Sequence, residues 1–281
     1  MAKVKVTCDS TCDLTAELVQ QYDITVLPLY VTMGDAQYRD GVDVNLKDVF
    51  EFVKQSGQLP KTAAVAMGDY IDCFTQLTAD GSEVVHINLS SSLSASHNNA
   101  KLAAEEVEGV YPVDSKSLST GSGLLVLYAA QLAQQGKSAK EIAQELEAKR
   151  EKVEASFVVD TLEYLRKGGR CSSVAALGAN LLKLKPCIEV TDGAMGVGKK
   201  YRGKIDVSIL QYVKERLEGR EDIDTSCVFI THTYAEEELV QAVRAEVAKY
   251  QHFDQVLESV AGCTIGSHCG KGTLGILFFR K

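Results

Sequence analysis

The sequence predicts an α/β protein of two domains, in which an α/β/α domain with a parallel sheet packs against an α+β domain. Two patterns and the length lead to this prediction. In the first half of the chain, short apolar segments alternate with segments of helical spacing. The second half mixes helix and strand signals in another order and includes a hairpin pattern. A length of 281 residues suits one large or two medium domains.

The N-terminal half accounts for the predicted parallel sheet. Strands are expected at residues 4–8, 24–31, 84–89 and 109–113. Helices are expected around residues 14–22, from Asn45 to residue 53, and at 67–78, 94–107 and 119–136. Because these strands are almost continuously apolar, both faces of the sheet should be covered by helices.

The C-terminal half starts after a charged helix at residues 138–152. Strands are expected at residues 156–160, 187–191, 199–202, 227–232, 254–259 and 273–279, and helices at 161–167 and 236–249. A glycine-rich segment at 193–198 predicts the turn of a hairpin. No Pro-rich or Ser-rich linker separates the halves, so we place the domains at 1–155 and 156–281 and expect them to pack closely.

Charge and hydropathy argue against several functions. The chain has 30 Lys and Arg against 38 Asp and Glu, a net charge of −8, which disfavours sequence-independent nucleic-acid binding and adsorption to anionic membranes. The longest apolar runs, at 124–132 and 274–279, are much shorter than the roughly 20 residues of a transmembrane helix. The first ten residues alternate like a strand and lack the apolar core of a signal peptide. We therefore expect a cytoplasmic protein whose eight cysteines are reduced.

The densest polar cluster is SSSLSAS at residues 90–96, between a predicted strand and a predicted helix. This position is the carboxyl edge of a parallel sheet, where such folds bind ligands. Hydroxyls and free helix N–H groups there suit a phosphate or a carboxylate. Helix capping by one serine is an equally good interpretation. Three other segments combine hydroxyls or carboxylates with a predicted element boundary: Asp9-Ser10-Thr11, Lys61-Thr62 and Asp114-Ser115.

Two more polar residues stand beside glycines. His268 lies in GCTIGSHCGKG, residues 262–272, whose glycine density predicts a loop that approaches another group closely. Arg170 follows Gly168-Gly169 and is either a surface side chain or an anion contact. Motifs for other chemistry are incomplete. The segment 193–200 has Lys where a P-loop needs Ser or Thr, and no nucleophile-elbow or zinc spacing occurs. We therefore expect neither a metal nor a cofactor.

In order along nearly the whole chain, these segments resemble the DegV family, whose members bind a fatty acid and serve as the carrier subunit of bacterial fatty-acid kinase. The similar segments are VTCDSTCDL (6–14), ITVLPLYV (24–31), YRDGVD (38–43), PKT (60–62), SSSLSAS (90–96), VDSKSLSTGSG (113–123), LEYLRKGGRCS (162–172), Lys185-Pro186 and GSHCGKGTLG (266–275). The resemblance implies a two-domain fold with a long-chain fatty acid in an apolar tunnel between the domains.

The resemblance also implies a head-group site. It places the carboxylate on Thr62 and Ser91, with Arg170 and His268 close by. Ser92 and Ser94 belong to the same head-group loop. Three neighbouring segments depart from the family pattern: AAVA follows PKT in place of SQPS, Ala95-Ser96 replaces the common Gly-Thr, and Lys271 stands where Pro is frequent. These departures bear on chain-length preference and partner docking.

By resemblance, the chain is expected to be a non-catalytic carrier. An ATP-dependent fatty-acid kinase subunit would phosphorylate the bound carboxylate to an acyl-phosphate, which a downstream acyltransferase would use. Burying about 15 methylenes at roughly 0.8 kcal/mol each gives about 12 kcal/mol before the costs of association. The tail would thus set the affinity, and the polar cluster would set the orientation of the ligand.

Two alternatives remain open at this point. One is a hydrolase or acyl-transfer enzyme with Ser91 as nucleophile, His268 as base and Asp9 or Asp114 as the orienting acid. The other is a binding module for a phosphorylated small molecule.

Overall fold

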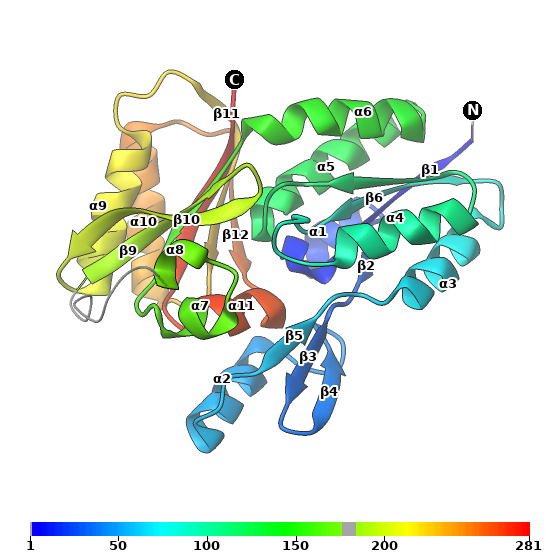
Figure 1. Cartoon of the computed structure of the whole chain (residues 1–281). Helices are drawn as coiled ribbons and strands as arrows, with labels where there is room; N and C mark the ends of the chain where they lie inside the picture. The colour runs from blue at the N-terminus through cyan, green and yellow to red at the C-terminus, as the bar shows by residue number, and fades with distance from the viewer. Residues whose placement is uncertain (1, 176–183) are drawn as a thin grey trace.

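The computed structural model describes residues 2–175 and 184–281, which form three sheets (Figure 1). The first is a four-stranded sheet of order β2-β1-β6-β7 in which every pair is parallel. Its strands are β1 (Val4–Asp9), β2 (Thr25–Leu27), β6 (Glu83–Asn88) and β7 (Val110–Asp114). The predicted parallel sheet is confirmed.

Helices cover both faces of the parallel sheet. One face carries α3 (Met67–Thr78) and α4 (Ser96–Glu106), and the other carries α1 (Ala16–Gln21), α5 (Ser119–Gln134) and α6 (Ala139–Lys149). Successive residues of β6 point to opposite faces: Val84 packs with the α3 side and Val85 with the α5 side. This alternation of buried faces explains why the strands are almost continuously apolar.

The second sheet is mixed and has the order β10-β9-β8-β13-β11-β12. Its strands are β8 (Val153–Val158), β9 (Leu184–Thr191), β10 (Ala194–Arg202), β11 (Ile223–His232), β12 (Gln255–Val260) and β13 (Leu274–Arg280). Helices α9 (Ile205–Leu217) and α10 (Glu237–Tyr250) pack against it. Helix α5 lies between the two large sheets, because its apolar side chains share one core with Val85, Phe229 and Leu277. Since β8 begins at Val153, the second sheet starts slightly before the boundary expected at residue 155.

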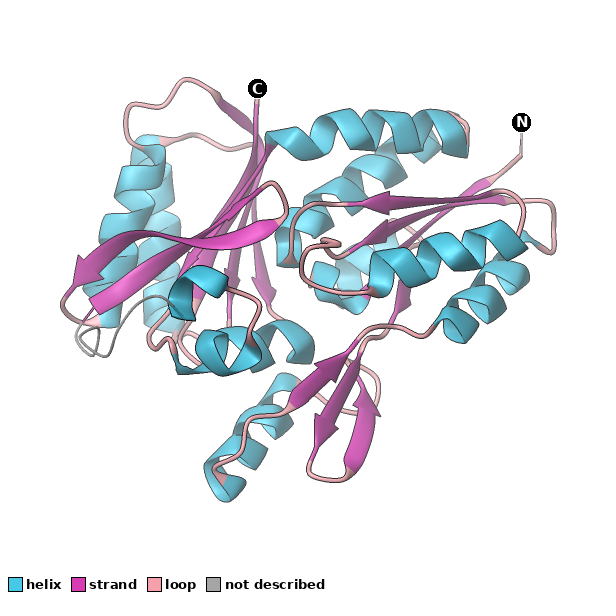
Figure 2. Ribbon diagram, viewed as in Figure 1, coloured by secondary structure: helices cyan, strands magenta, loops and turns pink. Residues whose placement is uncertain are grey.

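The third sheet was not predicted. It is antiparallel, has the order β4-β3-β5, and lies with helix α2 below the two large sheets (Figure 2). Its strands are β3 (Tyr30–Met33), β4 (Ala36–Arg39) and β5 (Lys61–Ala63), and α2 is Leu46–Ser56. The expectation of one strand over residues 24–31 was wrong. Pro28 lies between β2 and β3, and the chain passes there from one sheet to another.

Helix α2 confirms the start predicted at Asn45. The Asn45 side chain accepts from the amides of Lys47 and Asp48, and the Asp48 carboxylate accepts from the Asn45 amide, which is a capping box.

A further expectation was wrong: residues 263–269 form helix α11 (Cys263–Cys269) in place of a loop. The predicted hairpin is confirmed, but its turn is tighter than expected. The β9–β10 hairpin turns at Asp192-Gly193, where φ is +48° and +80°, and the other glycines of the segment 193–198 lie within β10.

Short helices complete the fold: η1 (Ser10–Cys12), η2 (Arg150–Lys152), α7 (Glu163–Gly168) and α8 (Ser172–Ala175). Within the described residues, no helix combines the length and apolar composition needed to cross a bilayer.

Candidate ligand-binding pocket

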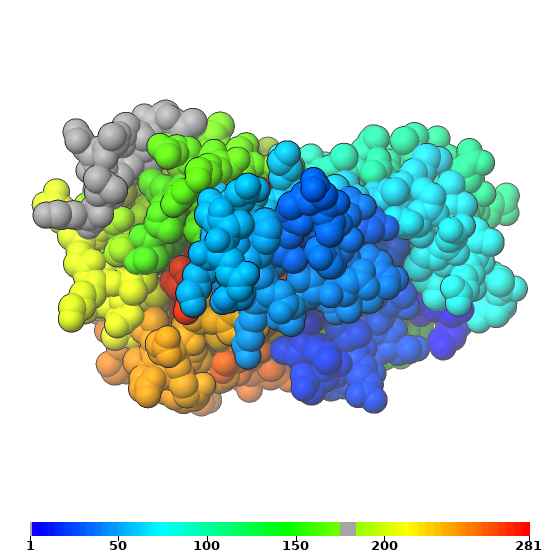
Figure 3. Space-filling model, turned by 90° about the horizontal axis from the view of Figure 1, so that it is seen from below, coloured from blue at the N-terminus to red at the C-terminus, as the bar shows by residue number. Residues whose placement is uncertain are grey.

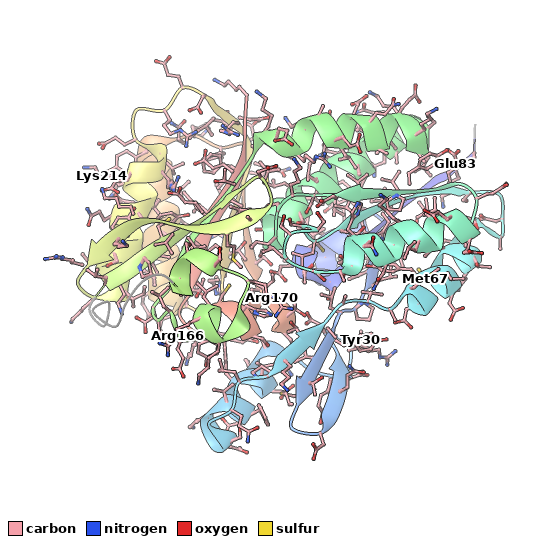
Figure 4. All side chains as sticks on the ribbon, viewed as in Figure 1. Tyr30, Met67, Glu83, Arg166, Arg170 and Lys214 are labelled. Atoms are coloured by element: carbon pink, nitrogen blue, oxygen red, sulfur yellow. The ribbon has the colours of Figure 1, made fainter. Side chains whose placement is uncertain are left out.

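A pocket lies where β5, α11, α7 and the serine-rich loop 90–95 meet. Figure 4 places Arg170 near the middle of this region, beside α11. The pocket has about 490 Å³ of atom-free space when its open mouth and the adjoining solvent are included. Its walls are formed by Leu29, Thr62, Ala63, Ala64, Leu89, Leu93, Ser94, Leu118, Arg170, Met195, Thr264, Ile265, His268 and Cys269. Most of these side chains are apolar, and both halves of the chain contribute.

Thr62 and His268 form the polar centre of the pocket. The Thr62 Oγ1 and His268 Nε2 atoms are 2.8 Å apart. Strand β5 positions Thr62, because it pairs with Val31 of β3, and the last turn of α11 carries His268. The other side of the imidazole packs on Gly168, where an added Cβ would lie 2.3 Å from Nδ1. Only a glycine at position 168 leaves room for the ring.

His268 is neutral at pH 7. Burial, and to a smaller extent the nearby Arg170 cation, lower the pKa of its imidazole to about 4. In the tautomer with its proton on Nε2, the ring donates to Thr62 Oγ1. The Thr62 hydroxyl can then donate its own proton to a ligand acceptor. Arg170, which follows the left-handed Gly169, is exposed and donates from Nη1 to the Gly168 carbonyl at 2.9 Å. It supplies a permanent positive charge at the pocket wall.

The serine-rich loop places one serine in the pocket wall. Ser94 lines the pocket, with its Oγ 3.0 Å from Ser96 Oγ. Ser91 is exposed and does not line it: its Oγ donates to Asp114 Oδ2 at 2.5 Å. Ser92 is also exposed and outside the pocket wall, and its amide donates to the Ser90 hydroxyl.

The amides of this loop already have partners, some of them within the loop: Ser90 donates to the Ser117 carbonyl and Ser91 to Asp114. The amides of Leu93 and Ser94 both donate to the Ser90 carbonyl, and the Ser90 hydroxyl donates to the Gly193 carbonyl at the tip of the β9–β10 hairpin. The Ser94 hydroxyl accepts from the amide of Ser96, the first residue of α4, at 3.2 Å. The capping interpretation is therefore confirmed for Ser94, whereas Ser91 and Ser92 make contacts elsewhere.

The structure does not assemble the triad considered from the sequence. Asp9 is buried and accepts from Tyr70 Oη at 2.6 Å and from the Leu89 amide at 2.9 Å. Asp9 also lies 3.2 Å from His86. Asp114 holds Ser91, and His268 holds Thr62. No sequence pattern indicates the Asp9 contacts, which hold Leu89 at the start of the serine loop.

A second cavity adjoins the first. Leu118, Ile265 and Cys269 belong to the walls of both, and the second cavity contains about 310 Å³ of atom-free space. Strand residues Phe157, Gly275 and Leu277 of the mixed sheet close it. The second cavity therefore adjoins the first on the side that faces the mixed sheet.

A separate surface groove lies on the underside, between α2, α7 and the loop before β13. Figure 3 shows this face, with part of the C-terminal region emerging between α2 and α7. Among residues 2–175 and 184–281, no group of three or more His, Cys, Asp or Glu side chains could hold a metal ion.

The fold and pocket define a class of α/β proteins with two large sheets, a smaller third sheet and a mostly apolar pocket that contains a few polar side chains. The chain belongs to the DegV family, whose family model matches residues 3–281. A DegV domain-containing protein of Clostridium acetobutylicum is 31% identical over 285 residues, covering 100% of both chains.

Solved structures show the same fold. A fatty-acid-binding DegV family protein from Thermus thermophilus has a TM-score of 0.89 at 31% identity, covering 99% of this chain and 100% of that one. A stearic-acid-binding protein from Eubacterium ventriosum has a TM-score of 0.88 at 28% identity, covering 100% of this chain and 99% of that one. Bacillus subtilis DegV, a fatty acid binding protein, has a TM-score of 0.87 at 29% identity with full coverage of both chains.

Proposed function

We propose that this protein binds a long-chain fatty acid, with the carboxylate at the Thr62–His268 end of the pocket and the tail along its aliphatic walls. The observation that carries the proposal is the pairing of Thr62 with a buried, neutral His268, near Arg170, in a pocket whose walls are mostly apolar. A hydroxyl donor and a cation are what a carboxylate requires. Fatty-acid binding by the Thermus, Eubacterium and Bacillus relatives supports the same assignment.

Within the serine loop, the geometry favours Ser94 as the second hydroxyl donor. Ser94 lines the pocket together with Thr62, whereas the Ser91 hydroxyl is engaged by Asp114. The assignment of the carboxylate to Ser91 and the role of Ser92 stay predictions. Alanine variants of Ser91 and Ser94 separate the two assignments.

We assign the tail to the two adjoining cavities, which together would form the tunnel between the halves. The carboxyl end would start beside His268, and the chain would pass Leu118 and Ile265 into the second cavity. At roughly 0.8 kcal/mol per buried CH₂, the tail contributes most of the affinity. The hydroxyls and Arg170 fix the direction in which the acid enters.

The carrier role extends this proposal to a partner. A cytoplasmic ATP-dependent kinase would transfer the γ-phosphoryl group of ATP to the bound carboxylate, giving an acyl-phosphate and ADP. A downstream acyltransferase would consume the acyl-phosphate. In this role the chain catalyses nothing by itself and presents the carboxylate at the pocket mouth. Arg170 would offset the charge that phosphorylation adds, because it is exposed there.

Binding of palmitate to the purified protein, measured by isothermal titration calorimetry, tests the first part. Wild-type protein should bind stoichiometrically, and a Thr62→Val, His268→Ala double variant should bind far more weakly.

The partner role is tested with ATP, a fatty-acid kinase subunit and hydroxylamine, which traps acyl-phosphate as a hydroxamate. Arg170→Ala should lower hydroxamate formation. If the protein alone hydrolyses esters and Ser91→Ala abolishes that activity, the hydrolase alternative would be supported instead.

A further inference from the structure

Thr264 is a pocket residue whose hydroxyl has no partner. It lies on α11 one helical turn before His268, is 4% exposed and lines the pocket. Its Oγ1 atom is buried and makes no hydrogen bond within the described residues. The other pocket hydroxyls do have partners: Thr62 bonds to His268 and Ser94 to Ser96. Thr264 is therefore the lining hydroxyl that a ligand would satisfy.

An isolated buried hydroxyl is costly, and a helical threonine usually avoids the cost by bonding to the carbonyl four residues earlier. Here that carbonyl belongs to Val260, which ends strand β12 and precedes the helix. Because the helix begins only at Cys263, the usual partner is absent from its first turn. The hydroxyl is left unpaired on a residue that lines the pocket.

The first turn of α11, which carries Thr264, is held by two aspartate side chains from the first half of the chain. Asp40 accepts from the amides of Cys263 and Thr264 at 2.8 and 2.9 Å, and Asp13 accepts from the Gly262 amide at 2.8 Å. Asp13 is in turn held by the Ser119 hydroxyl at 2.5 Å. These contacts occupy the first amides of α11, so those amides do not serve a ligand. They also fix the position from which the Thr264 side chain extends.

We propose that the Thr264 hydroxyl donates a hydrogen bond to the carboxylate of the bound fatty acid. This inference rests on the proposed function and adds a residue to its head-group site. Residues four apart lie on one face of a helix with a rise of about 6 Å, a separation that one carboxylate can bridge. A carboxylate has about four acceptor positions, so Thr62, Ser94 and Thr264 can all donate to it.

The direction in which one substitution changes the affinity for palmitate tests the inference. Thr264→Val keeps the shape and removes the hydroxyl. If the hydroxyl donates to the carboxylate, palmitate should bind about tenfold more weakly, whereas Thr264→Ser should bind within about threefold of wild type. Binding of 1-hexadecanol, which lacks the carboxylate, should change by less than about threefold in both variants.

The opposite result overturns the inference. If the hydroxyl only borders the tail, Thr264→Val should bind palmitate as tightly as wild type or more tightly, because an unpaired polar group has left an apolar wall. Thr264→Cys, with a weak donor of similar size, provides the same comparison should the valine variant not fold. Failure of the wild-type protein to bind palmitate would refute the proposed function instead.

Discussion

Gly168→Ala should weaken fatty-acid binding although position 168 carries no functional group. An added Cβ would lie 2.3 Å from His268 Nδ1 and 3.1 Å from His268 Cε1. Ordinary contacts between such atoms begin near 3.5 Å, so the imidazole must retreat by about 1 Å. The Thr62–His268 distance of 2.8 Å would then exceed the range of a hydrogen bond.

The expected loss follows from that one contact. A net hydrogen bond contributes about 1–1.5 kcal/mol, which corresponds to roughly a tenfold rise in the dissociation constant for palmitate. Backbone strain should not contribute, because the φ of Gly168 is not positive and alanine suits a helix. The effect should therefore appear in ligand affinity through displacement of the His268 ring.

Calorimetric titration with palmitate measures the effect, and the His268 ring resonances in NMR spectra report the displacement. Gly68→Ala is the matched control. It lies in helix α3, its Cβ would meet nothing within 4 Å, and its φ is ordinary. This control should bind palmitate like wild type. Wild-type affinity in a Gly168→Ala protein whose His268 resonances have shifted would refute the proposed role of the Thr62–His268 pair.

Three further predictions follow from the pocket. Ser94→Ala should weaken palmitate binding about tenfold in calorimetry, whereas Ser91→Ala should change it by less than about twofold because Asp114 engages that hydroxyl; the reverse order would restore the Ser91 assignment. Ile265→Phe should narrow the passage between the cavities and reduce stearate binding at least about tenfold more than decanoate binding, and equal losses would place the tail elsewhere. The free energy of unfolding, measured with urea, should fall by up to about 3 kcal/mol as pH drops from about 6.5 to 4. The reason is that the imidazole pKa of His268 is about 4 in the fold and near 6.5 when unfolded, so the unfolded chain takes up the proton first. In the His268→Gln variant, the free energy of unfolding should depend less steeply on pH over this range. The same pH dependence in the variant and in wild type would contradict the depressed pKa of His268.

Local patterns were sufficient for much of the fold. The apolar periodicity of residues 67–78 gave the bounds of α3, and the Asn45 cap gave the start of α2. The periodicity of α9 was also readable, since Ile209, Tyr212 and Val213 have helical spacing and are buried, but no helix was expected there.

Helix α11 shows why the rest required the structure. Its sequence is rich in glycine and looks like a loop. Its first amides are capped by Asp13 and Asp40, which lie 249 and 223 positions away in the chain. A helix that depends on such distant caps has no local signal. The Pro28 break between two sheets is a similar case, because both of its flanks look like one strand.

Some residues of the candidate site could be expected before the structure was known, and others could not. Thr62, Arg170 and His268 were expected from the family resemblance, and the structure brings them together with Ser94. The contact between Gly168 and His268 joins two helices far apart in sequence, so spacing alone does not reveal it. Thr264 carries no motif, and its unpartnered hydroxyl becomes visible only when every neighbour is placed.

Native mass spectrometry of the protein purified from cells without added lipid tests whether the pocket holds a fatty acid. We expect a bound mass that matches a long-chain fatty acid, is released as the free acid on denaturation, and is depleted in the Thr62→Val, His268→Ala double variant. A bound polar or phosphorylated metabolite in its place would contradict fatty-acid binding. So would an empty wild-type protein that also fails to take up palmitate.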